Sequence, residues 1–161
     1  SKNDLGISHA FNRGILHSNE RFILFLNAGD TLLPDSGFKI IKKCSGNHEN
    51  DCIWFSVIRD SKGNKSIFKP KLKYLHYAMS CPHQGMIIKR DVFSKIGLFP
   101  LQKYSMDHYI ALKLLKSNPK IKIDVSAIAL YPSGGHSTIG GVKPFLYNIY
   151  NTVITSRFII F

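Results

Sequence analysis

Apolar residues along this chain follow two spacings, and each spacing predicts a different kind of element. In some segments they recur three or four positions apart, as on one face of a helix; Ile110, Leu114 and Leu115 are an example. In others they form short continuous runs, which suit strands that are buried on both faces. The predicted helices cover residues 8–18, 34–44, 72–80, 90–96 and 107–117, and the predicted strands cover residues 21–26, 51–59, 66–69, 86–89 and 121–130.

The order of these elements predicts an α/β fold, because helices and strands alternate along the chain. Ser8 is positioned to cap the predicted helix 8–18, and Gly97 ends the predicted helical turn 90–96. We expect one α/β domain over residues 1–140, followed by an apolar and aromatic tail, 141–161. The tail lacks the length of uninterrupted apolar sequence that a transmembrane helix needs. It is either a segment close to a membrane or a helix packed on the domain.

Composition and charge narrow the function classes. The hydrophobic fraction of 44% and the aromatic fraction of 12% indicate a folded domain. Cys44, Cys52 and Cys81 lack the spacing of a disulfide framework or a metal site, which indicates reduced thiols in a cytoplasmic protein. The net charge of +12 suits nucleic acid, an anionic membrane surface or an anionic substrate. No zinc-finger, homeodomain or RNA-recognition motif accompanies this charge.

Two aspartates stand where chemistry is commonly placed. Asp30 follows a predicted buried strand, where α/β folds bind ligands, and its carboxylate can hold a divalent cation that bridges a diphosphate. Asp107 begins a predicted helix, whose dipole keeps a carboxylate ionised for work as a general base. Both can equally be turn or helix caps. His108 is the second candidate for the base.

Two further segments carry polar side chains that suit a sugar or a diphosphate. The loop 81–85 presents His83 and Gln84, which can hydrogen-bond hydroxyl groups. The segment 133–138 is rich in glycine and hydroxyl groups and carries His136, which can add a ligand to a metal. An ordinary loop and a linker are the alternatives.

Taken in order, these motifs resemble those of family 2 glycosyltransferases with the GT-A fold, particularly the branch that builds bacterial polysaccharides. The resemblance implies a Rossmann-like mixed sheet flanked by helices. It covers most of the chain to about residue 140. The resembling stretches are DLGISHAFNRGI (4–15), RFILFLNAGDTL (21–32), HQGMIIKRDVFSKIGLF (83–99), MDHYIALKL (106–114) and GGHST (134–138).

The resemblance also implies roles for single residues. Asp30 matches the metal-binding aspartate of the family's DXD-type motif, so it would ligate Mg²⁺ or Mn²⁺, with Asn27 at a position where many relatives have an aspartate. Asp107 matches the catalytic base, with Met106 in place of a preceding acid and His9 at another position where an aspartate is usual. The substrate-binding residues are expected to be Asn12, Arg13, Asn27, His83, Gln84 and His108.

The implied reaction is an inverting, metal-dependent transfer of a sugar from a nucleotide-diphosphate donor, expected to be a UDP-sugar. The acceptor would be a saccharide or a polyprenyl-linked sugar, with peripheral contact at the inner face of the membrane and no nucleic acid partner. Family members begin with a strand, a helix and a second strand that have no counterpart here, so we expect an N-terminally truncated domain. An inactive or partner-binding fragment and a basic nucleic-acid-binding domain are the alternatives.

Overall fold

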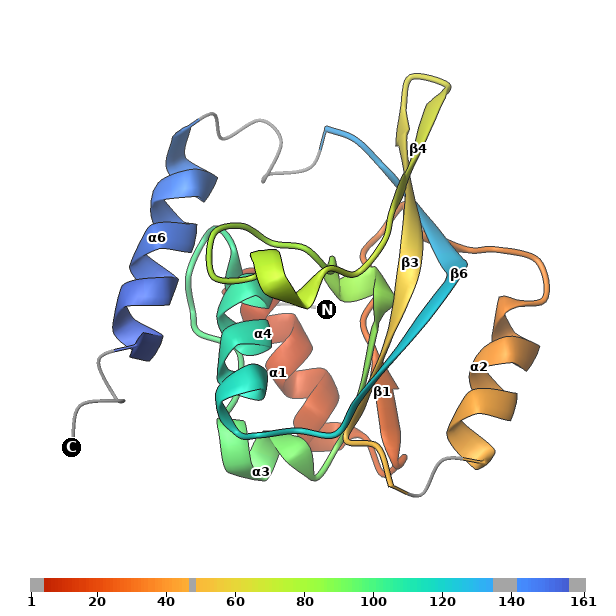
Figure 1. The fold of residues 1–161 in the computed structure, drawn as a ribbon, viewed down its shortest axis with the longest axis horizontal. Helices are drawn as coiled ribbons and strands as arrows, with labels where there is room; N and C mark the ends of the chain where they lie inside the picture. Colours follow the sequence, from red (N-terminus) through yellow and green to blue (C-terminus); the bar gives the residue numbers. More distant parts are fainter. Residues whose placement is uncertain (1–4, 47–48, 135–141, 157–161) are drawn as a thin grey trace.

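A computed structural model describes residues 5–46, 49–134 and 142–156 and shows a mixed sheet with helices on both faces (Figure 1). The strand order is β1-β5-β3-β6-β2, and β4 forms a hairpin with β3. The pair β3 and β6 is parallel, and the other pairs of the described sheet are antiparallel. The strands are β1 (Phe22–Leu24), β2 (Thr31–Leu32), β3 (Cys52–Ser61), β4 (Asn64–Phe68), β5 (Met86–Lys89) and β6 (Ile121–Pro132).

Strand β3 lies at the centre of the sheet, and its first six residues are buried. Their side chains alternate between the faces, as in any strand. Cys52 and Trp54 belong to the larger apolar cluster, whereas Ile53, Phe55 and Val57 belong to the smaller one. The continuous apolar run in the sequence therefore reflects burial on both faces, as predicted.

The helices cover the two faces unequally (Figure 1). The larger cluster contains apolar side chains of α1, α3 and α4, whereas on the other face α2 packs against the smaller cluster through Ile40 and Cys44. α6 packs against α4, and no helix of the described residues is long and apolar enough to span a membrane. The helices are α1 (Ile7–His17), α2 (Ser36–Ser45), α3 (Val92–Ile96), α4 (Met106–Lys116) and α6 (Val142–Ser156), with 3₁₀ turns η1 (Leu72–Tyr74) and η2 (His83–Gly85).

The structure corrects the predictions at several boundaries. The run 21–26 forms a strand of only three residues, in which Ile23 is buried and Phe22 and Leu24 are partly buried. This strand, β1, is an edge strand and pairs only with β5 among the described strands. The predicted helix 72–80 is reduced to the 3₁₀ turn η1 and further turns. The predicted loop 81–85 contains η2, which is buried. Ser8 lies inside the first turn of α1 and does not cap it.

Helix α2 is attached to β6 by one ion pair. Lys43 Nζ lies 2.7 Å from Asp124 Oδ2. Burial raises the pKa of Asp124, but the bond from Lys43 and two bonds from Ser126 outweigh it and lower the pKa to about 2. A carboxyl group with a lowered pKa stabilises the fold above its unfolded-state pKa, and this contribution is lost as the pH falls through the folded-state pKa.

We expect Asp124→Asn to lower the free energy of unfolding by about 1–2 kcal/mol at neutral pH, because the ion pair with Lys43 is lost. The loss stays in this range because Lys43 is partly exposed and solvent screens the pair. The difference from the wild type should shrink between about pH 4 and about pH 2, where the native carboxyl group takes up its proton. Urea unfolding at several pH values measures this. Asp35→Asn, an exposed position, is the control and should change little; a pH-independent loss in Asp124→Asn would contradict the electrostatic origin.

Turn η2 lies close against β3 at a single glycine. A Cβ atom at Gly85 would meet the carbonyl oxygen of Phe55 and lie 3.0 Å from Cγ1 of Val57. Because that oxygen belongs to the backbone of the central strand, neither β3 nor η2 can easily move to make room for the added atom. We expect Gly85→Ala to destabilise the protein by about 1–3 kcal/mol in a thermal or urea melt.

The matched control is Gly14→Ala in helix α1, where an added Cβ meets no atom within 4 Å. Alanine favours a helix over glycine by up to about 1 kcal/mol, so this variant should be as stable as the wild type or more stable. Equal losses in both alanine variants would show that the close approach at Gly85 is not the cause.

Candidate active site where the β1 turn meets helix α4

Asp30 ends a tight turn that follows β1. The Asp30 N–H donates to the Asn27 carbonyl oxygen at 3.0 Å, and the Asn27 N–H donates back to Asp30 Oδ2 at 2.7 Å. Gly29 has a φ of 93°, a conformation that glycine adopts without strain. The Asp30 side chain is 4% exposed. The segment Asn-Ala-Gly-Asp thus holds the carboxylate in place through its own backbone.

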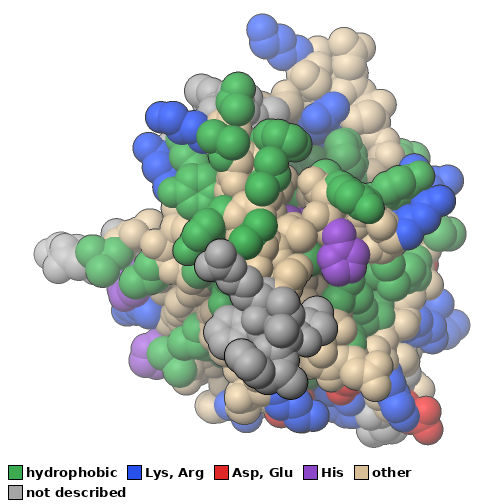
Figure 2. Space-filling view, turned by 60° about the vertical axis from the view of Figure 1, so that its left-hand side comes forward, with side chains coloured by type: hydrophobic (Ala, Val, Ile, Leu, Met, Phe, Trp, Pro, Cys, Tyr) green, Lys and Arg blue, Asp and Glu red, His purple; other side chains and the backbone are tan. Residues whose placement is uncertain are grey.

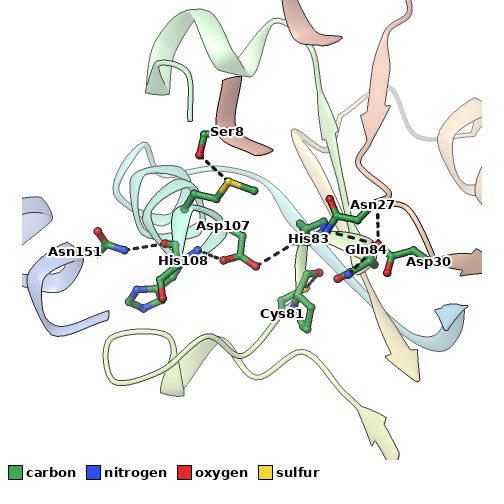
Figure 3. Close-up of polar contacts among 12 residues, drawn as sticks. Ser8, Asn27, Asp30, Cys81, His83, Gln84, Asp107, His108 and Asn151 are labelled. Carbon is green, nitrogen blue, oxygen red and sulfur yellow. Dashed lines mark hydrogen bonds and ion pairs between the residues drawn. The ribbon is translucent and has the colours of Figure 1, made fainter. Parts of the chain in front are cut away.

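Turn η2 brings two side chains to this turn (Figure 3). Gln84 Nε2 donates to Asp30 Oδ2 at 3.0 Å, and Asn27 Nδ2 lies 3.1 Å from His83 Nε2. Gln84 Oε1 is buried and has no hydrogen-bond partner among the described residues. Turn η2 thus contacts the Asp30 turn through the side chains of both His83 and Gln84.

Asp107 reaches the same cluster from the first turn of α4. His83 Nδ1 lies 3.4 Å from Asp107 Oδ2, and the His108 N–H donates to Asp107 Oδ1 at 2.9 Å. Asn27 Nδ2 can only donate, so Nε2 of His83 accepts its hydrogen bond and Nδ1 carries the proton that is donated to Asp107. The edge contact with the Phe11 ring, 5.3 Å between centroids, holds the imidazole between the two carboxylates.

The surroundings keep Asp107 ionised. Burial raises the pKa of this carboxyl, but the bond from His83 and the His108 N–H outweigh burial, and the net effect lowers the pKa below its usual range. Cys81 lies beside it, where burial and then the Asp107 charge raise the pKa of the thiol well above its usual range. Cys81 is therefore an unreactive neutral thiol at this position, and Asp107 is the residue that can accept a proton.

The side chains of Asn12 and His108 make their hydrogen bonds outside this cluster. The Asn12 side chain donates to the Phe99 carbonyl oxygen at 2.9 Å and accepts from the Phe99 N–H at 2.8 Å, so it fastens α1 to the segment after α3. His108 is fully buried, its Nε2 lies 2.6 Å from the Leu75 carbonyl oxygen, and burial lowers its pKa. Arg13 is exposed on α1. His136 lies outside the described residues.

Two contacts had no signal in the sequence. His83 joins both aspartates, although the sequence marked it only as a hydroxyl-binding loop residue. Met106 is buried, and its sulfur lies 2.8 Å from the Ser8 hydroxyl oxygen, which makes this position part of the α1–α4 contact (Figure 3). Both are long-range pairs, which spacing within one segment cannot reveal.

A divalent cation at this turn would have one carboxylate ligand, Asp30, from the described residues. No group of three or more His, Cys, Asp or Glu side chains is arranged to hold a metal ion within the described ranges. Asp30 alone supplies a carboxylate beside the turn. Magnesium commonly binds through one or two carboxylates together with substrate phosphates, and a donor set of this kind matches that pattern.

A hollow of about 390 Å³ is lined by residues of α1, the end of β1 and the segment that follows β1. Its lining side chains are apolar apart from Asn27, and none of them is charged. The hollow therefore offers no charged group to a ligand. The lining residues are Ile7, Ala10, Phe11, Gly14, Leu24, Phe25, Leu26, Asn27 and Ala28.

Comparison with known proteins identifies the fold and no closer relationship. No protein-family model matches the sequence, and no curated protein matches it. The crystal structure of Staphylococcus aureus TarS 1–349 is similar to this chain with a TM-score of 0.67 and 13% identity, over 96% of this chain and 46% of that one. A second S. aureus TarS structure gives a TM-score of 0.63 and 12% identity, over 89% of this chain and 26% of that one.

The chain therefore spans less than half the length of either structure. At this identity the likeness concerns the fold alone. The expected class is confirmed: the chain has a GT-A-like glycosyltransferase fold, with a mixed sheet flanked by helices.

Proposed function

We propose that this chain transfers a sugar from a nucleotide-diphosphate donor, expected to be a UDP-sugar, to a hydroxyl group of a saccharide or lipid-linked acceptor. The observation that supports this is the meeting of Asp30 and Asp107 at His83, within a glycosyltransferase fold. His83 Nε2 lies 4.0 Å from Asp30 Oδ2, and Nδ1 lies 3.4 Å from Asp107 Oδ2. In this proposal Asp30 acts on the leaving diphosphate, and Asp107 acts on the attacking hydroxyl group.

Asp107 is the general base in this proposal. Its carboxylate takes the proton of the acceptor hydroxyl as the oxygen bonds to the anomeric carbon. The bond from that carbon to the phosphate oxygen breaks, and the nucleoside diphosphate leaves with the electron pair. Attack opposite the leaving group inverts the anomeric centre. The Asp107 side chain is 20% exposed, so an acceptor can reach it, and each oxygen keeps a lone pair beyond its present bond.

Asp30 would hold Mg²⁺ or Mn²⁺, which when bound neutralises the charge of the departing diphosphate. Gln84 and the Asn27 N–H fix the orientation of the Asp30 carboxylate, since both donate to its Oδ2. His83 positions the base, because it donates to Asp107 and is itself held by Asn27. Arg13 and His136 remain proposed ligands of the donor and the metal.

We expect Asp107→Asn to lower the rate of sugar transfer by about 10²–10⁴-fold, because the amide cannot accept the acceptor's proton. Release of nucleoside diphosphate from a panel of sugar donors, with and without acceptors, measures the rate. Asp91→Asn, an exposed aspartate before α3, is the control and should keep full activity. Wild-type rates in Asp107→Asn would remove this residue from the mechanism.

Donor binding can be measured apart from turnover. At about 100 times its dissociation constant, Mn²⁺ with UDP should stabilise the chain by roughly 2.7 kcal/mol, seen as a higher melting temperature. Asp30→Ala should abolish the shift relative to its own melt without ligand, whereas Asp91→Ala should keep it. A cooperative melt that does not move in the wild type would contradict a nucleotide site in this polypeptide and would favour a non-catalytic role.

A further inference from the structure

Helix α6 faces the rest of the protein with its polar side. Asn151 is fully buried, and its Nδ2 donates to the Ser105 carbonyl oxygen at 2.8 Å. Thr152 Oγ1 donates to the His76 carbonyl oxygen at 2.9 Å. Lys116 Nζ donates to the Thr155 carbonyl oxygen at 3.0 Å. Hydrogen bonds of side chains and carbonyl groups therefore dock this helix on α4, on the turn around His76 and on the segment before α4.

The opposite side of α6 is an exposed apolar stripe. Its six members recur at spacings of three and four, so they lie on one face of the helix. Each of them is 46–66% exposed. The stripe consists of Val142, Phe145, Leu146, Ile149, Tyr150 and Val153.

This orientation reverses the usual one. A helix on the surface of a globular protein buries its apolar stripe and exposes its polar residues. Here the polar side of α6 makes specific contacts inside, so rotating the helix to bury the stripe would break the Asn151 and Thr152 bonds. Contiguous exposed apolar surface of this kind marks a contact with a protein partner or a membrane. No described residue outside α6 covers the stripe, so its exposure marks a contact surface.

The charge around the stripe indicates what contacts this surface. Helix α6 carries no acidic residue, and neither do residues 71–80 or 102–105, which contact it. Cationic side chains flank it on these segments. Figure 2 shows hydrophobic side chains gathered on this side, with Lys and Arg around them and acidic side chains only at the lower edge. The cations of α6 and of these segments are Lys71, Lys73, Lys103 and Lys143.

We infer that the stripe binds the surface of an anionic phospholipid bilayer, with α6 lying in the plane of the interface. An amphipathic helix with lysines beside its apolar face binds in this way, and its lysines are attracted to acidic headgroups. A second copy of the chain is a poor cover, because it would bring two basic rims together in a protein of net charge +12. The inference is independent of the sugar transfer proposed above.

The test is co-sedimentation of the full chain with vesicles of phosphatidylcholine alone or mixed with phosphatidylglycerol. We expect binding to the mixed vesicles, little to the neutral ones, and release as salt is added, because exposed charges are screened. The double variant Leu146→Gln and Ile149→Gln should bind about tenfold or more weakly, since two apolar side chains no longer enter the interface.

The matched control is Phe38→Gln with Ile41→Gln on α2, which removes two exposed apolar side chains from the other side of the sheet (Figure 1). It should bind like the wild type. Lys103→Gln and Lys143→Gln should each weaken binding by about fivefold. Melting curves establish that every variant is folded.

Three results would overturn the inference. The first is wild-type protein that stays unbound on the mixed vesicles. The second is equal loss of binding in the α6 and α2 double variants, which would indicate a general effect of apolar surface. The third is a lipid-free dimer, seen by sedimentation velocity, that the α6 double variant abolishes; it would identify a second copy as the cover.

Discussion

Burial of β3 on both faces is the constraint on which the rest of the structure depends. Its six buried residues join the two apolar clusters, and it is the only strand of the described sheet with three partners, β4, β5 and β6. Because its backbone is fixed, the Phe55 carbonyl oxygen is a rigid surface. Turn η2 lies directly against it, and only glycine fits at residue 85. The position of His83 and Gln84 thus follows from the core.

The candidate site is polar where the core ends. Asp30 is almost fully buried, yet it carries hydrogen bonds from a backbone N–H and from Gln84. A buried carboxylate without such donors would be strongly unfavourable. The same donors that make burial tolerable also fix the direction of the carboxylate. The site is therefore preorganised by the contacts that stabilise it, which is what a transfer reaction requires of its charged groups.

Much of the fold could be predicted from the sequence because the signals are local. The run 51–59 identified the central strand, and the spacing of Ile110 and Leu114 identified α4. The failures occurred where tertiary contacts decide. The run 21–26 is apolar enough for a buried strand, but only residues 22–24 pair in the sheet, and Leu26 beyond them is exposed. Asp30 and Asp107 could be selected from their segments, but the bridge through His83 depends on packing that brings three segments together.

The parallel pairing of β3 with β6 has a consequence for the order in which the molecule forms. Residue Cys52 lies opposite Ile121, so the central pair cannot close until the intervening chain is present. That intervening chain contains η2 and α4, which carry His83 and Asp107. Pairings between distant segments form slowly, since the entropy of closing a long loop comes first. The same pairing therefore encloses in one loop the segments that bring His83 and Asp107 to the turn of Asp30.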